Sequence, residues 1–350
     1  MFKCKMTIGL FFVGLLCAGG LVHARAPQPA TQDKTEHGMS GSMHELINYL
    51  ESQHTTGFLL IQDGHVLVEQ NWPAPERDKV FASFVYERTK EGSLLEDVAS
   101  AQKSFVSVLV AIAVDKGLID VEKPVSAYLG TGWSRAAPDQ EARIRVLDVL
   151  TMSSGLDEGF AYVAPAGRQF FYNTPVYAVT KRILTSASGQ PLDAITKDWL
   201  TVPTGMEDTE WRQRPGALAG VGNATGLVTS PRDLAALGTM ILKGGIGADG
   251  RRVVSQAGLN AMFMPSGANP AYGRLWWLNG SAFTVRASGR KDGPLIGAAP
   301  ADMVAAFGAL DRRLYIIPSK KLIVVRTGAA ASDTNFDDEV WRRVAALLGS

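Results

Sequence analysis

Ser100 and Lys103 are the residues of this sequence that best combine a nucleophile with a base. They are three positions apart, so on a helix their side chains share one face and the hydroxyl comes within hydrogen-bond reach of the amine. A lysine can accept the proton of a serine when burial and neighbouring cations lower its pKa. The N-terminus of the same helix would add a positive field where an oxyanion forms. Taken alone, Ser-x-x-Lys occurs by chance about once in a chain of this length, and a capping serine with a solvated lysine is the simpler explanation.

The histidines and cysteines exclude the more common hydrolase mechanisms. No histidine occurs after His65, so none follows Ser100 to complete a triad in the order used by α/β-hydrolases. Neither Gly-x-Ser-x-Gly nor His-Glu-x-x-His occurs. Both cysteines, Cys4 and Cys17, lie near the N-terminus, so a chain that loses this segment has no thiol nucleophile, disulfide or cysteine-ligated zinc. We expect neither a metal nor a cofactor.

Residues 1–24 have the pattern of a secretory signal peptide. Two lysines precede an apolar run over residues 6–22, which is too short and too glycine-rich for a convincing membrane span. Small residues predict cleavage after Ala24, whereas Pro27 would hinder the other suitable cut, after Ala26. We expect a periplasmic or secreted protein with no stable membrane span after cleavage; an uncleaved anchor is the alternative.

Length and composition favour one large folded unit behind this segment. The chain has 350 residues, of which 46% are apolar and 20% charged, so it can bury a sizeable core. Residues 25–42 lack periodicity and are expected to be a leader linker, followed by one domain over residues 43–350. The net charge is +1 with no basic stripe, which argues against a nucleic-acid partner.

The elements expected around the Ser-Lys pair are strands at both ends of the domain and helices between them. Asp63-Gly64 separates two apolar runs and predicts a β-hairpin, and apolar spacing predicts a buried helix from about Ser100 to Lys116. Short β-type runs recur after Tyr272, before a closing helix over about residues 337–348. We therefore predict an α+β (α/β sandwich) fold: an antiparallel sheet flanked by helices. Its β-sheet subdomain spans about residues 43–120 and 270–350, and a mostly helical subdomain spans about 121–269.

Several ordered motifs surround Ser100 and Lys103. The first runs from Asp97 to Phe105, and the later ones are Val149 to Leu156, Gly167 to Tyr177, Thr225 to Leu227 with Ser230 to Leu234, and Tyr272 to Trp277. Together these motifs resemble the penicillin-binding-protein-like serine hydrolases. That family includes class C β-lactamases, D-alanyl-D-alanine carboxypeptidases, family VIII esterases and 6-aminohexanoate-oligomer hydrolases. The resemblance covers most of the mature chain and implies a serine β-lactamase/transpeptidase-like fold.

The resemblance also implies roles for individual residues. Ser100 matches the nucleophile, and Lys103 matches its base partner. Tyr172 matches the family tyrosine, which as a phenolate or through Lys103 moves a proton to the leaving group; a buried core aromatic is its alternative role. Thr174 stands where the family usually has Asn or Ser, so a substrate-binding hydroxyl is kept and the amide is lost.

The third family element, Lys-Thr-Gly or a variant ending in Gly on an edge strand, has no literal match. We place it at Ala306-Phe307-Gly308, because two further strand patterns follow as they do in the family. On this register the Ala309 amide joins the Ser100 amide as the oxyanion hole, and Gly308 lines the substrate site. Arg312 is a candidate for binding a substrate carboxylate, although an arginine beside a strand is more commonly an exposed surface residue.

The leading hypothesis is an exported serine hydrolase that cleaves small ester, amide or peptide-like substrates through an acyl-enzyme on Ser100. A class C-type β-lactamase or D-alanyl-D-alanine carboxypeptidase is the second hypothesis, although the absent cationic third motif argues against it. A catalytically silent penicillin-binding-like receptor is the third, and intact Ser100, Lys103 and Tyr172 argue against that one.

Overall fold

The computed structural model describes residues 32–349. The expected signal peptide, residues 1–24, lies outside the described residues. The first described element is helix α1 (Gln32–Ser52), which occupies part of the segment that we expected to be a linker. Among residues 32–349, no helix is both long enough and apolar enough to cross a membrane.

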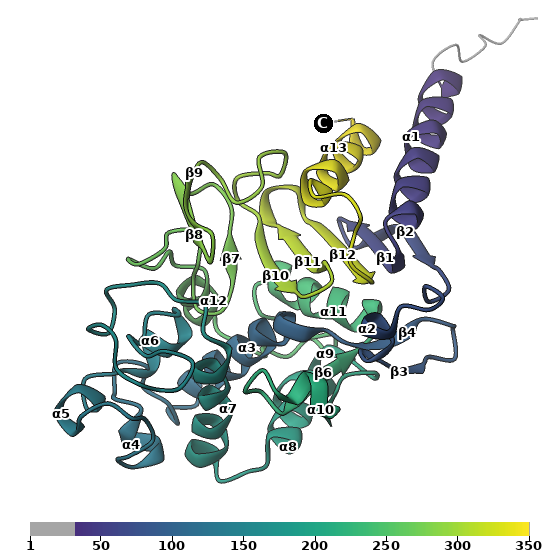
Figure 1. Cartoon of the computed structure of the whole chain (residues 1–350). Helices are drawn as coiled ribbons and strands as arrows, with labels where there is room; N and C mark the ends of the chain where they lie inside the picture. The colour runs from purple at the N-terminus through teal and green to yellow at the C-terminus, as the bar shows by residue number, and fades with distance from the viewer. Residues whose placement is uncertain (1–31, 350) are drawn as a thin grey trace, which may run out of the picture.

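The main sheet is antiparallel, has six strands and joins the two ends of the described chain (Figure 1). Asp63 and Gly64 both have positive φ, as a two-residue hairpin turn requires, which confirms the predicted hairpin of β1 and β2. Strand β1 also pairs with β12, so the N-terminal hairpin and the C-terminal strands form one sheet. In spatial order the strands are β2 (His65–Asn71), β1 (Thr55–Gln62), β12 (Leu322–Gly328), β11 (Arg312–Ile317), β10 (Val304–Gly308) and β7 (Trp277–Leu278).

Both faces of this sheet are covered by helices. Along β1, Phe58 and Leu60 point into one apolar cluster while Leu59 and Ile61 point into another, as the alternation of a strand dictates. The first cluster lies under α1 and the closing helix α13 (Phe336–Leu348). The second lies under α11 (Pro231–Leu242) and α3 (Gln102–Asp115), which Figure 1 shows on the opposite side of the sheet. This is the sandwich that the sequence predicted.

The middle of the chain contains more than helices. A four-stranded antiparallel sheet forms within this part of the molecule, and it draws two of its strands from the region that we expected to be helical. Its strands, in spatial order, are β3 (Val85–Arg88), β4 (Leu94–Asp97), β6 (Thr225–Thr229) and β5 (Glu210–Gln213).

The remaining elements are short apart from α7. They are α2 (Lys79–Ala82), η1 (Ala99–Ala101), α4 (Ser126–Leu129), α5 (Pro138–Glu141), α6 (Val146–Leu150), α7 (Thr174–Ser188), α8 (Leu192–Thr196), the π-helical turn η2 (Lys197–Thr201), α9 (Val202–Thr204), α10 (Gly216–Ala219), α12 (Gln256–Met262), the hairpin β8 (Phe283–Arg286) and β9 (Gly289–Asp292), and η3 (Pro318–Lys320).

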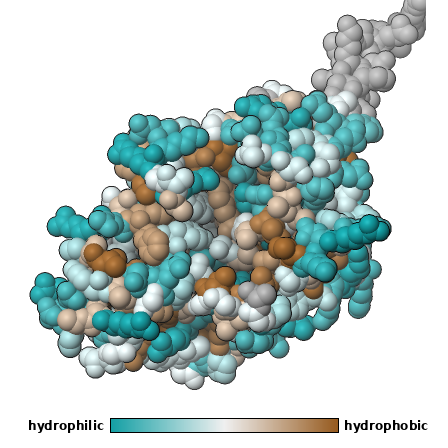
Figure 2. All heavy atoms as spheres, in the orientation of Figure 1, coloured by the Kyte–Doolittle hydropathy of each residue, from teal (hydrophilic) through white to brown (hydrophobic). Residues whose placement is uncertain are grey.

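Helix α3 lies between the main sheet and the helical part of the molecule that contains α7. Every residue from Gln102 to Ala113 is buried, because the helix contacts the main sheet on one side and α7 on the other. The outer surface is different in character: on the face shown in Figure 2, apolar residues form separate small areas among hydrophilic ones. At the start of α3, three polar side chains are buried in this apolar interior: Gln102, Lys103 and Ser104.

Candidate active site

Ser100 and Lys103 lie at the start of α3, as predicted. Ser100 is in η1, a short 3-10 helix that directly precedes α3, and Lys103 is in the first turn of α3. The Lys103 Nζ lies 2.9 Å from the Ser100 Oγ, so the predicted hydrogen bond is present. Lys103 is only 2% exposed, whereas Ser100 remains half-buried, so the hydroxyl is the part of the pair that faces solvent.

Burial makes Lys103 a base. Desolvation of the ammonium, with a further contribution from the positive charge of Arg214, lowers the pKa of Lys103 to about 7. A substantial fraction of the amine is therefore neutral at neutral pH, and its lone pair can take the Ser100 proton. Lys103 also donates a 3.2 Å hydrogen bond to the Thr174 Oγ1, which places Thr174 beside the pair.

Tyr172 completes the group. Its hydroxyl forms a hydrogen bond with Ser100, and the Lys103 Nζ lies 4.8 Å from the centre of its ring. Burial raises the pKa of Tyr172 to about 12, and the bond to Ser100 only partly offsets this. The phenol is therefore protonated at neutral pH. Of the two forms that the sequence left open, this geometry favours a tyrosine that relays a proton with Lys103 over one that acts as a phenolate.

Helix α7 and its cap fix the segment that carries Tyr172 and Thr174. Asn173 is the N-cap of α7: its side-chain oxygen accepts from the Val176 N–H at 3.1 Å, and its amide donates to the Leu156 carbonyl at 2.9 Å. Thr174 is the first residue of α7 and is followed by a proline, which is favoured at a helix start. The cap thus turns the two neighbouring side chains, at 172 and 174, toward Lys103.

Two aromatic rings contact Tyr172 and a third extends the stack, and the sequence analysis gave none of them a role. Trp277 stacks on Tyr172 with 5.8 Å between ring centroids, and Phe307 stacks on Trp277 at 5.9 Å. Tyr272 meets Tyr172 edge to face at 6.1 Å. Trp277 and Tyr272 lie in a motif that the sequence singled out, and Phe307 lies in β10, so their positions in the sequence were the available signal. The rings form an apolar wall beside the polar group.

The end of strand β10 packs closely against the backbone just before η1, the turn that contains Ser100. A Cβ on Gly308 would lie 2.3 Å from the Val98 carbonyl oxygen, so only glycine permits this contact. The pairing of β10 with β7 involves only Val304 and Ala305, so the following residues of the strand have an open edge. This places the end of β10, where we located the third motif, directly against Val98, the residue before η1.

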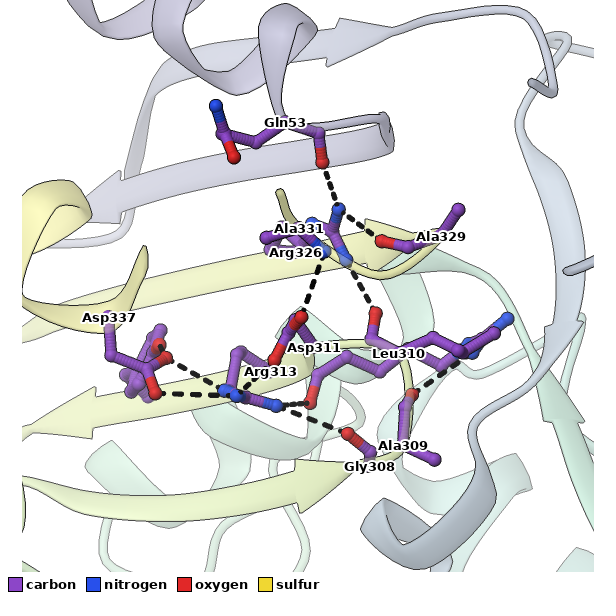
Figure 3. A network of polar contacts seen from close by, with 12 residues as sticks. Gln53, Gly308, Ala309, Leu310, Asp311, Arg313, Arg326, Ala329, Ala331 and Asp337 are labelled. Carbon is purple, nitrogen blue, oxygen red and sulfur yellow. Dashed lines mark hydrogen bonds and ion pairs between the residues drawn. The ribbon is translucent and has the colours of Figure 1, made fainter. Parts of the chain in front are cut away.

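Three buried arginines hold the turn that follows β10, and Figure 3 shows two of them, Arg313 and Arg326. Arg313 donates to the Gly308 carbonyl at 3.1 Å, Arg312 to the Ala309 carbonyl at 3.1 Å, and Arg326 to the Leu310 carbonyl at 2.7 Å. Three successive carbonyls are thus each bound by a different guanidinium. The turn that carries the Ala309 amide is fixed from inside the protein.

The position of Arg312 corrects our expectation. Its side chain has no exposed surface and forms an ion pair with Glu96, with 2.8 Å between Nε and Oε2. Arg313 is also buried and is paired with Asp311 and Asp337. Because Arg312 is enclosed and its charge is matched, it cannot contact a substrate carboxylate. It supports the β10–β11 turn instead.

The described residues 32–349 contain no group of three or more His, Cys, Asp or Glu side chains arranged to hold a metal ion. The polar side chains around Ser100 are a lysine and two hydroxyls, which are the components of a proton-transfer site. The arrangement can activate a serine for attack on a carbonyl carbon.

The comparison with known families agrees with this geometry. The sequence model of the Beta-lactamase family matches residues 49–348. The chain belongs to the Beta-lactamase family. This confirms the resemblance that the motifs around Ser100 indicated.

Individual relatives are distant. The chain is 23% identical over 242 residues to the D-alanyl-D-alanine-carboxypeptidase/endopeptidase AmpH of Escherichia coli K12, a match that covers 60% of this chain and 59% of AmpH. The chain thus spans less than two thirds of the length of the curated relatives it matches. Among solved structures, the β-lactamase/D-alanine carboxypeptidase from Yersinia pestis superposes with a TM-score of 0.62 at 16% identity, over 89% of this chain and 99% of that one. EstCE1, a hydrolase with promiscuous acyltransferase activity, gives a TM-score of 0.62 at 14% identity, over 89% and 98%. These structures share the predicted fold.

Proposed function

We propose that the protein is a serine hydrolase that forms an acyl-enzyme on Ser100. The observation that carries this proposal is the 2.9 Å contact between the Ser100 Oγ and the amine of Lys103, whose pKa burial lowers to about 7. A serine held this way has a neutral amine within hydrogen-bond distance, which can accept its proton as the Oγ attacks a carbonyl carbon.

The reaction follows from these positions. Lys103 takes the Ser100 proton as the Oγ attacks the carbonyl carbon, and the negative oxygen is bound by the backbone amides of Ser100 and Ala309. The carbon–leaving-group bond then breaks, Tyr172 gives its proton to the departing alcohol or amine, and the Lys103 ammonium returns a proton to Tyr172. Water then hydrolyses the acyl-enzyme. It attacks the ester carbonyl, its proton passes to the amine of Lys103, and the Ser100 oxygen leaves and takes up a proton.

The substrate that fits this site best is a small neutral ester, or a small amide. Ala306 stands where the family pattern would have a lysine, and Arg312 and Arg313 are enclosed within the protein. Strand β10 has no cation and both arginines of β11 are buried, so neither strand offers a cation to a substrate carboxylate, while the wall of Trp277 and Phe307 offers apolar contact. A β-lactamase or D-alanyl-D-alanine carboxypeptidase is the second candidate, favoured by the similarity to the carboxypeptidase AmpH of Escherichia coli and to the β-lactamase/D-alanine carboxypeptidase of Yersinia pestis.

A fluorophosphonate tests the proposal. It phosphonylates only an activated serine, so mass spectrometry should find one adduct, located on Ser100. Ser100→Ala should abolish the adduct and the turnover of esters, and Lys103→Ala should reduce both by about a thousandfold or more. Ser104→Ala is the matched control, because Ser104 is a buried serine of the same helix whose hydroxyl binds the Leu275 carbonyl and no lysine. An unlabelled wild-type protein would favour the silent receptor instead, and a labelled Ser100→Ala would show that the nucleophile is another residue.

We also propose that the protein is exported, on the strength of the signal-like residues 1–24. Expression of the full chain followed by mass measurement should give a mature form that begins at Arg25. A mature mass that retains the apolar run would support an uncleaved anchor.

A further inference from the structure

The backbone just before Ser100 is strained. Ala99 has φ of +49°, in the left-handed region that residues with a Cβ avoid at a cost of about 1–2 kcal/mol. It lies between the end of β4 and the nucleophile, so this conformation decides where the Ser100 hydroxyl points. A side chain two residues earlier holds it: the Asp97 Oδ1 accepts the Ala99 N–H at 2.8 Å.

Asp97 is itself held by a buried arginine. Arg214 donates to both carboxylate oxygens, from Nε at 2.7 Å and from Nη2 at 2.9 Å, which is the strongest geometry for this pair. Asp97 has no exposed surface and Arg214 is 7% exposed. A Cβ on Gly226 would lie 2.0 Å from the Asp97 Oδ2 and 2.8 Å from the Arg214 Nε, so this position of β6 makes room for the pair by being glycine.

The pair also lies within electrostatic reach of the base. Burial lowers the pKa of Lys103, and the positive charge of Arg214 lowers it further. The titratable and charged groups around Lys103 are Ser100 in η1, Tyr172 before α7, Tyr177 and Lys181 in α7, Asp97 at the end of β4, and Arg214 after β5. Burial lowers the pKa of Lys181 as well, to about 6, and its amine contacts the Asn223 side chain and Thr225.

We propose that the buried Asp97–Arg214 pair is a positioning device for the nucleophile and its base, which rests on the proposed function of Ser100 and Lys103. Asp97 fixes the turn that presents Ser100, and Arg214 both locks Asp97 and supplies the positive charge that keeps Lys103 able to accept a proton. Neither residue touches the substrate. The two halves of the pair carry opposite charges, so removing one or the other should move the pKa of Lys103 in opposite directions, and this makes the proposal testable.

The experiment is the pH profile of kcat/KM for a neutral ester in three variants. Arg214→Met removes the cation and leaves the anion, so Lys103 should bind its proton more tightly and the acid limb should move to higher pH by about one unit or more. Asp97→Asn removes the anion and keeps a carbonyl oxygen for the Ala99 N–H, so the acid limb should move to lower pH. Arg214→Lys keeps the positive charge but loses the paired hydrogen bonds to the Asp97 carboxylate. The acid limb should therefore stay at the same pH while kcat falls.

Glu96→Gln is the matched control. Glu96 is the neighbour of Asp97 and is equally buried, but its partner is Arg312, whose charge does not contribute to the lowered pKa of Lys103 as that of Arg214 does. It should lower the melting temperature without moving the acid limb. A melt of each variant verifies folding; if Arg214→Met and Asp97→Asn do not fold, Arg214→Lys must still show the reduced kcat with an unmoved limb.

Two outcomes would overturn the proposal. One is an acid limb that stays in place, or moves in the same direction, in Arg214→Met and Asp97→Asn; the other is an unchanged kcat in Arg214→Lys. Failure of the proposed function gives a different result, since wild-type protein would then show neither a fluorophosphonate adduct nor ester turnover.

Discussion

Replacing Gly308 by alanine should damage the active site far more than the fold. Gly308 does not have a positive φ, so alanine can adopt its backbone conformation, and the only cost is the space its Cβ needs. That Cβ would lie 2.3 Å from the Val98 carbonyl oxygen and 3.1 Å from the Arg312 Cβ. A carbon and an oxygen ordinarily approach to about 3.3 Å, so the end of β10 and the residue before η1 must separate by about 1 Å.

That displacement sets the expected magnitudes. A shift of about 1 Å between a nucleophile and the group that stabilises its transition state can cost about a hundredfold in rate. Overpacking of this kind destabilises a protein by about 1–3 kcal/mol. We therefore expect a folded Gly308→Ala protein with a moderately lower melting temperature. Its ester turnover and its rate of fluorophosphonate labelling should both be lower by about a hundredfold.

The assay compares Gly308→Ala with Gly267→Ala by thermal melt, kcat/KM for a p-nitrophenyl ester, and labelling rate. Gly267 is the control because a Cβ there meets nothing within 4 Å and its φ is not positive. It should match the wild-type protein in all three measurements. Wild-type turnover and labelling in a folded Gly308→Ala would refute the assignment of β10 as the strand that supplies the oxyanion amide.

Three other predictions follow from the same group of residues. Tyr172→Phe keeps the ring stacked on Trp277 and removes the hydroxyl, so turnover should fall by at least about a hundredfold with little change in melting temperature; loss of folding with unchanged specific activity would indicate a core aromatic. Because Lys103 must be neutral to act and burial lowers its pKa to about 7, kcat/KM should rise with pH through about 7, and an acid limb near 10 would contradict this role. Short-chain neutral p-nitrophenyl esters should be cleaved at least about tenfold better than cephalosporins, since β10 offers no cation to a carboxylate; an equal or higher kcat/KM for a cephalosporin would favour the β-lactamase hypothesis.

Local patterns predicted the parts of the structure that depend on local contacts. The Asp63-Gly64 turn, the C-terminal strands and the closing helix all followed from turn residues and periodicity. The Ser100–Lys103 contact followed from helical spacing, although the helix begins two residues later than expected and Ser100 lies in the 3-10 turn before it. This small shift matters, because the orientation of the Ser100 hydroxyl then depends on the turn at Ala99 and not on the helix.

Contacts between distant parts of the chain could not be predicted. Arg214 meets Asp97 across 117 positions, and Arg312 meets Glu96 across 216. An arginine beside a strand is usually exposed, and nothing near Arg312 in the sequence indicates the carboxylate that encloses it. Strand β5 was missed for a similar reason: its four residues are polar or half-exposed, and it is a strand because it pairs with β6.

Arg313, which lies beneath the β10–β11 turn, affects the N–H of Ala309 in that turn. The Gly308 carbonyl and the Ala309 N–H are the two ends of one peptide group, joined by resonance across the C–N bond. Arg313 donates to that carbonyl at 3.1 Å, and a cation bound at the oxygen draws electrons from the nitrogen, which makes its hydrogen more positive. Part of a buried charge is thus relayed through a neutral peptide to the surface of the site. In the proposed reaction, a turn built this way would attract the single oxygen that becomes negative, and it would offer no full charge to an anionic substrate at rest.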